Sequence, residues 1–167
     1  MEYIIPKGKN YPKGLHFYLF PKKVISGTFI LSKSALYSNK GLDERSFTSW
    51  NKITGLTNLL TFGKDSGRLA YRCINNSYFQ IGSYIHDRGG YNVINNPARI
   101  ITTVEPEEEC YFRLEELDYG YQFNVNDAVL LHPKSTKSSI LRYRNIPYIQ
   151  YGDAPALQDT KIIINFK

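Results

Sequence analysis

The chain is poor in several residue types whose abundance would mark a particular protein class. It has two cysteines, one methionine and one tryptophan in 167 residues. Two cysteines do not make the disulfide framework of a small secreted domain. No hydrophobic run is long enough for a membrane helix, and the start, Met-Glu-Tyr-Ile-Ile-Pro, lacks the features of a secretory signal. These absences predict a cytoplasmic protein in a reducing compartment, without membrane contact.

Signatures of metal and nucleotide chemistry are also scarce. The three histidines, His16, His86 and His132, lie far apart, and none has metal-ligand spacing to another His, Cys or acid. The stretch Gly63-Lys64-Asp65-Ser66-Gly67 lacks the spacing of a phosphate-binding loop and a following helix. The sequence therefore predicts neither a metal site nor a cofactor.

Aromatic residues are abundant, at 14%, with fourteen tyrosines and nine phenylalanines. Tyrosine favours strands and also serves on binding faces, because it combines flat apolar area with a polar tip. The net charge of +6 is unevenly placed, since residues 1–42 hold seven lysines and a single acid, Glu2, whereas the rest is balanced. Such asymmetry can mark an arm that meets an anionic partner, but scattered solvating lysines are the favoured interpretation, because the lysines are adjacent only at Lys22-Lys23.

Short alternating runs separated by polar turns dominate the chain and predict an all-β fold. A short helix has room only near Trp50-Asn51-Lys52-Ile53, and residues 32–49 are expected to form a long polar excursion. We predict an antiparallel β-sandwich of the jelly-roll, concanavalin-like type, forming one domain over residues 1–167 with an extended, basic segment at 1–14. The expected strands are 15–20, 23–32, Arg68–Ile74, Tyr78–His86, Tyr91–Ile94, Arg99–Val104, Cys110–Glu115, Tyr119–Val125, Ala128–Leu131, Ile140–Arg144, Tyr148–Tyr151 and Lys161–Phe166.

The most informative stretch runs from Gly67 to Asp87, where two strand-like runs flank Asn75-Asn76-Ser77. One side of this predicted hairpin is apolar and should face the core; it carries Leu69, Tyr71, Cys73, Phe79, Ile81 and Ile85. The other side, here called the polar face, carries Arg68, Arg72, Tyr78, Gln80, Tyr84 and His86. Cys73 is thus expected to be a buried free thiol, while a disulfide with Cys110 stays open.

A loop at residues 75–77 fixes the register of this hairpin. Arg72 should lie opposite Gln80, Ala70 opposite Gly82, and Arg68 opposite Tyr84, because a one-residue slip would place Arg72 opposite Phe79 in the core. The small pair Ala70 and Gly82 would then leave a shallow recess between arginine and tyrosine side chains. Arginine offers paired donors to phosphate or carboxylate, and tyrosine stacks on bases or sugars. The same residues could instead form cross-strand pairs that solvate an outer sheet face.

Several segments resemble an uncharacterised family of bacterial and phage-encoded β-sandwich proteins. They are Thr28-Phe29-Ile30, Trp50-Asn51-Lys52-Ile53-Thr54-Gly55-Leu56, Ser66 to Arg72 with Ile81 to Ile85, and Tyr148 to Pro155 before Lys161-Ile162-Ile163-Ile164. The resemblance implies a lectin-like jelly roll and no established activity, and Tyr151 stands where a second glycine is expected. Separately, Tyr78-Phe79-Gln80-Ile81-Gly82-Ser83-Tyr84 is similar to the Tyr-Phe-Lys-x-Gly-x-Tyr strand of jelly-roll polysaccharide lyases, whose other motifs are absent.

The leading functional interpretation is a non-enzymatic binding protein. Its polar face (Arg68, Arg72, Tyr78, Gln80, Tyr84 and His86) would hold an anionic or polyhydroxylated ligand: a nucleotide, a nucleic acid or an acidic glycan. In a phage setting, inside the host cytoplasm, it would sequester a nucleotide signal or block a host protein. One alternative is an enzyme cleaving a glycan or nucleotide, with Tyr84 and His86 as acid and base and Arg72 neutralising the substrate charge. Another is a virion or other structural protein, such as a homo-oligomer built through sheet edges.

Overall fold

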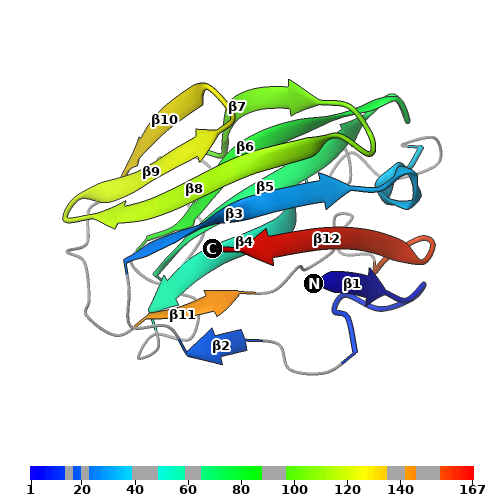
Figure 1. Cartoon of the computed structure of the whole chain (residues 1–167), viewed down its shortest axis with the longest axis horizontal. Helices are drawn as coiled ribbons and strands as arrows, with labels where there is room; N and C mark the ends of the chain where they lie inside the picture. Colours follow the sequence, from blue (N-terminus) through cyan, green and yellow to red (C-terminus); the bar gives the residue numbers. More distant parts are fainter. Residues whose placement is uncertain are drawn as a thin grey trace.

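A computed structural model describes residues 1–13, 17–19, 23–38, 49–58, 65–87, 97–134, 142–145 and 155–167. Two antiparallel six-stranded sheets lie face to face (Figure 1), which confirms the predicted all-β sandwich. The first sheet has the order β1-β12-β3-β8-β9-β10 and the second the order β2-β11-β4-β5-β6-β7. The strands are β1 (Glu2–Ile5), β2 (Phe17–Leu19), β3 (Val24–Leu31), β4 (Asn51–Asn58), β5 (Ser66–Ile74), β6 (Tyr78–His86), β7 (Arg99–Val104), β8 (Glu109–Leu117), β9 (Gly120–Val125), β10 (Ala128–Pro133), β11 (Arg142–Asn145) and β12 (Thr160–Phe166).

The core forms where the alternating side chains of the two sheets meet. In β3 every second residue is buried, from Ile25 to Leu31, and β8 follows the same rule with Cys110, Phe112 and Leu114. Branched and aromatic side chains at a period of two therefore turn one face of each strand inward. The apolar side of the hairpin takes part, since Leu69, Tyr71, Cys73, Phe79, Ile81 and Ile85 are all at most 2% exposed.

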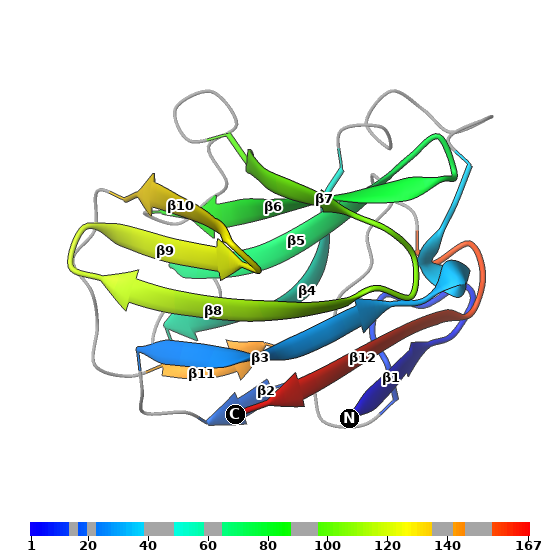
Figure 2. The same cartoon turned by 45° about the horizontal axis from the view of Figure 1, so that its top comes forward.

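The N-terminal and C-terminal strands are neighbours, although the chain separates them by more than 150 residues. β1 pairs with β12, and the amino group of Met1 donates to the carbonyl oxygen of Ile164 at 2.8 Å. Figure 2 shows the two ends of the chain close together at this edge of the first sheet. The expected extended segment at residues 1–14 thus contributes one short strand, β1.

One local prediction was wrong, and two predicted strands lie outside the described residues. The segment around Trp50-Asn51-Lys52-Ile53 is not helical, because Asn51–Asn58 forms strand β4; the helix described is a short 3-10 turn at Lys33–Ala35. The expected strands 91–94 and 148–151 fall outside the described residues. Both cysteines are buried free thiols in different sheets. Within the described ranges, none of the helices is long and apolar enough to cross a membrane.

Candidate functional site

The β5–β6 hairpin has the predicted register. Arg72 lies opposite Gln80, Ala70 opposite Gly82, and Arg68 opposite Tyr84. Its turn depends on Asn75 and Asn76, which both adopt positive φ angles, 52° and 54°, while the Ser77 amide donates to the Ile74 carbonyl at 3.0 Å. Asparagine tolerates this left-handed conformation better than most residues. The turn therefore sets the register that places six polar side chains on one face.

One end of the polar face gathers Arg68, Tyr84 and His86. Arg68 and Tyr84 are direct cross-strand partners, and the rings of Tyr84 and His86 lie 5.2 Å apart between centroids. All three side chains are partly exposed. A phenol, an imidazole and a guanidinium thus come together where a ligand can reach them, which is a suitable set for proton transfer next to a negative charge.

Lys52 of β4 joins the same group. Its Nζ lies 4.4 Å from the centroid of the Tyr84 ring, and the residue is only 4% exposed. Burial, followed by the like charge of Arg68, lowers the pKa of Lys52 from 10.5 to about 7. A lysine in this condition is poised to gain or lose a proton near neutral pH, and such groups concentrate at functional sites.

The other end of the polar face is built differently. The Arg72 Nε donates to the Gln80 Oε1 at 2.8 Å, and the guanidinium carbon lies 4.9 Å from the Trp50 ring. A Cβ atom on Gly82 would meet the Trp50 indole at 2.6 Å, so the indole covers the centre of the hairpin. The predicted recess at Ala70 and Gly82 is therefore wrong: both residues are buried, and Trp50 fills the space.

The predicted ligand residues thus separate into two groups. Tyr84 and His86 lie with Arg68, whereas Arg72 and Gln80 bond to each other on the far side of the indole. Tyr78 lies beyond them, next to the turn and opposite Ile74. Among the described residues, the cations placed next to Tyr84 are Arg68 and Lys52, in place of Arg72, which the sequence suggested as the neutralising group.

A second polar group lies between the sheets. The Ser83 hydroxyl and the His132 Nδ1 are 2.7 Å apart, and both residues are 0% exposed. Burial, followed by the charge of Arg99, lowers the pKa of His132 from 6.5 to about 4. The side chain of Lys134, two residues after His132, is also fully buried. It pairs with Glu116 and, at 3.5 Å, with Asp65. Because these side chains are buried, we assign them a structural role.

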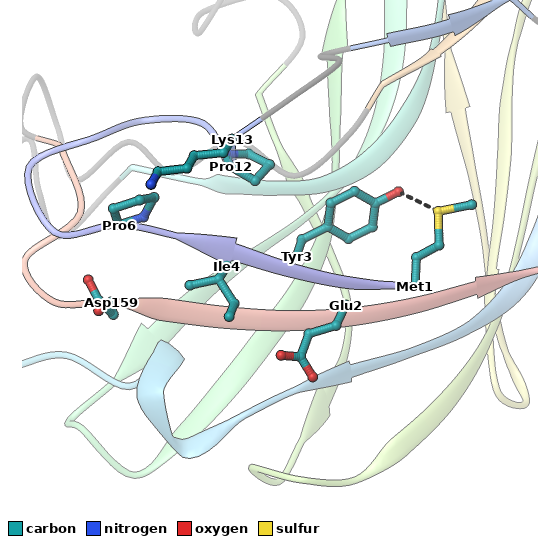
Figure 3. A pocket seen from close by; sticks show the side chains of 8 residues that line it. All are labelled: Met1, Glu2, Tyr3, Ile4, Pro6, Pro12, Lys13 and Asp159. Atoms are coloured by element: carbon teal, nitrogen blue, oxygen red, sulfur yellow. Dashed lines mark hydrogen bonds between the residues drawn. The ribbon is translucent and has the colours of Figure 1, made fainter.

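An open cavity of about 800 Å³ lies at the N-terminal edge, far along the chain from the hairpin. Figure 3 shows Ile4, Pro6, Pro12 and Lys13 around it, and the Tyr3 hydroxyl donating a hydrogen bond to the Met1 sulfur. Its acid Asp159 already accepts the Lys7 amide at 2.8 Å. The second acid at the cavity, Glu2, pairs with Lys161 at 2.8 Å, so both acids are already engaged and the Tyr84 end of the polar face remains the better candidate.

Sequence reasoning missed Lys52 and Trp50 as parts of the site. The register of β4 against β5 shifts between Lys52 and Thr54, so Ile53 is an extra residue in the ladder. This bulge breaks the period-two pattern from which faces are assigned. The signal available was a lysine close to two large apolar residues, with Ile53 directly after it and Trp50 two positions before it.

No protein-family model matches the sequence, and the search of curated proteins finds no match. Solved structures do share the fold. An alginate lyase from Pseudomonas aeruginosa superposes with a TM-score of 0.63 at 10% identity, over 99% of this chain and 80% of that chain. A polysaccharide lyase of family 18 gives 0.58 at 9% identity, over 99% and 87%. An alginate lyase from Alteromonas gives 0.53 at 10% identity, over 91% and 72%.

These neighbours correct the leading functional interpretation from the sequence. A non-enzymatic binding protein for nucleotides, nucleic acids or glycans is contradicted, because the three structures compared above are lyases of polysaccharides or of alginate. The alternative of a glycan-cleaving enzyme agrees better with them. At 9–10% identity the likeness itself establishes the jelly-roll fold.

Proposed function

We propose that the protein cleaves an acidic polysaccharide at the Tyr84 end of the polar face. The observation that carries this proposal is the contact of Tyr84 with His86, 5.2 Å between ring centroids, directly opposite Arg68. The structural neighbours support the substrate class, since they are alginate and polysaccharide lyases.

The three side chains suit a β-elimination. His86 takes the proton from the carbon next to the sugar carboxylate, and Arg68 stabilises the negative charge that builds up there. Tyr84 donates its hydroxyl proton to the glycosidic oxygen as the bond from that oxygen to the sugar ring breaks. A carbon–carbon double bond forms in the ring, and no water is consumed. One proton leaves the substrate and one returns to the leaving sugar, so the reaction balances.

The test is turnover of a panel of uronate polymers, such as alginate, polygalacturonate and hyaluronate, with a neutral glucan as reference. The unsaturated product is followed by its ultraviolet absorbance. We expect Tyr84→Phe and His86→Gln each to lower kcat by about 100-fold or more, as is usual for losing a general acid or base.

Tyr119→Phe is the matched control, because Tyr119 is 62% exposed in the turn between β8 and β9. It should keep the activity of the wild type. Full activity of Tyr84→Phe, or no cleavage of any polymer by the wild type, would refute the proposal.

A further inference from the structure

Lys52 has surroundings that the acid–base pair alone does not explain. It extends from β4 across β5 to the ring of Tyr84 on β6, passing over its cross-strand partner Ala70, which has no side chain beyond Cβ. Only 4% of the residue is exposed. Lysine is rarely buried to this degree, so its place beside a partly exposed phenol calls for a functional account.

Among the described residues, the charged or titratable side chains placed against Lys52 are Arg68 on β5 and Tyr84 on β6, and His86 contacts Tyr84 further along β6. Arg68 is permanently cationic and repels an ammonium group on Lys52, and burial disfavours the ammonium further. Both effects favour a neutral amine in the free protein, in agreement with the pKa of about 7. A negative charge arriving next to Tyr84 reverses this balance, since it attracts both cations and favours the ammonium form.

We propose that Lys52 recognises the negative charge of the substrate and takes up a proton as an acidic sugar binds beside Tyr84. This inference rests on the proposed function for its ligand, an acidic sugar, but assigns a new role to a residue outside the acid–base pair. Substrate binding then completes a pair of cations, Lys52 and Arg68, that the free protein does not hold fully charged. A neutral sugar gains nothing from this step, so Lys52 also becomes a determinant of specificity.

The experiment measures binding and proton uptake together. Short alginate and polygalacturonate oligomers are titrated calorimetrically at pH 8 into the Tyr84→Phe variant, which keeps the ring under Lys52 and lacks the acidic hydroxyl. Titrations in phosphate and in Tris, whose heats of ionisation differ, give the number of protons taken up. We expect uptake of nearly one proton, and an affinity that falls towards tenfold per pH unit between pH 7 and 9.

Lys52→Arg in the same background is the deciding variant, because arginine is charged at every pH used. It should bind with comparable affinity, take up no proton, and show a flat pH profile. Lys52→Met should bind at least tenfold more weakly at pH 7. Trp50 fluorescence and a thermal melt check that each variant is folded.

The outcomes separate the two proposals. If the wild type cleaves a uronate polymer but the Tyr84→Phe variant binds without proton uptake, the role of Lys52 is refuted and the proposed function stands. If uptake persists in Lys52→Arg, another group such as His86 takes the proton, and the role of Lys52 is again refuted. If no uronate oligomer is bound and no uronate polymer is cleaved, both proposals fall.

Discussion

At the scale of single residues, Gly82 determines how the polar face is filled. Its missing side chain leaves room for the indole of Trp50, since a Cβ atom on Gly82 would lie 2.6 Å from the indole. The guanidinium of Arg72 lies over the same indole ring. The backbone oxygen of Arg99 lies 2.9 Å from the same position, so the protein has little freedom to move away. The residue without a side chain thus separates the two halves of the polar face.

Gly82→Ala should displace the indole. We expect a loss of about 1–3 kcal/mol in the free energy of unfolding, as is typical for overpacking, together with a red-shifted tryptophan emission. Trp50 is the single tryptophan of the chain, so the emission reports on this site alone. Urea unfolding followed by fluorescence measures both effects. Ser77→Ala in the exposed turn of the same hairpin is the control, and an unchanged spectrum for Gly82→Ala would refute the packing argument.

At the scale of elements, the sequence predicted the β5–β6 hairpin correctly and the neighbouring strand β4 incorrectly. Alternation in the hairpin is unbroken from Arg68 to His86 apart from the turn, so the faces and the register followed from the pattern. In β4 the bulge at Ile53 breaks the alternation, and the side chain of Lys52 could not be assigned to a face. Pairing with β5 across the sheet decides that face, and such long-range pairing is not visible in local sequence.

The edge strand β10 is attached to β6 of the opposite sheet through His132 and Ser83. A pKa of about 4 for His132 means that the folded protein resists protonation that the unfolded chain accepts near pH 6.5. The unfolded state therefore binds more protons between these values, and the free energy of unfolding falls as the pH drops from 6.5 to 4. The pKa difference corresponds to about 3 kcal/mol.

Chemical denaturation across this pH range measures the loss. His132→Gln, which cannot be protonated, should flatten the profile between pH 6.5 and 4 at the expense of some stability at pH 7. An equally steep loss in His132→Gln would show that other groups cause it.

At the scale of the whole molecule, the two sheets are joined by a buried charge cluster as well as by apolar packing. Lys134 follows β10, Glu116 belongs to β8, and Asp65 precedes β5 of the second sheet. The hydroxyl of Tyr121 also donates to Asp65, at 3.3 Å. Lys134 thus compensates carboxylates from both layers. The sequence predicted the sandwich itself, because alternation specifies an inner face. It did not predict that Lys134, Glu116 and Asp65 come into contact, because they lie far apart along the chain.

Lys134→Met should lower the free energy of unfolding by about 3–5 kcal/mol, because it leaves two buried carboxylates without their cation. Lys23→Met is the matched control: Lys23 pairs with Asp118 at 3.9 Å on the surface, where both side chains are well exposed, and its loss should cost less than about 1 kcal/mol. Adding Glu116→Met to Lys134→Met should restore part of the stability. Equal effects of the two lysine substitutions, measured by urea unfolding, would contradict the stabilising role of the buried charge cluster.

The placement of β12 between β1 and β3 has a consequence for how the chain is made. Ribosomes deliver β1 and β3 early and β12 long after them, so the first sheet keeps a gap between β1 and β3 while the intervening strands are made. Pairing over such long sequence separations is slow, and meanwhile one edge of β3 is open to strands of other chains. We therefore expect the first sheet to be completed only after β12 has been made, with chaperone dependence and yield governed by how fast that strand inserts between β1 and β3.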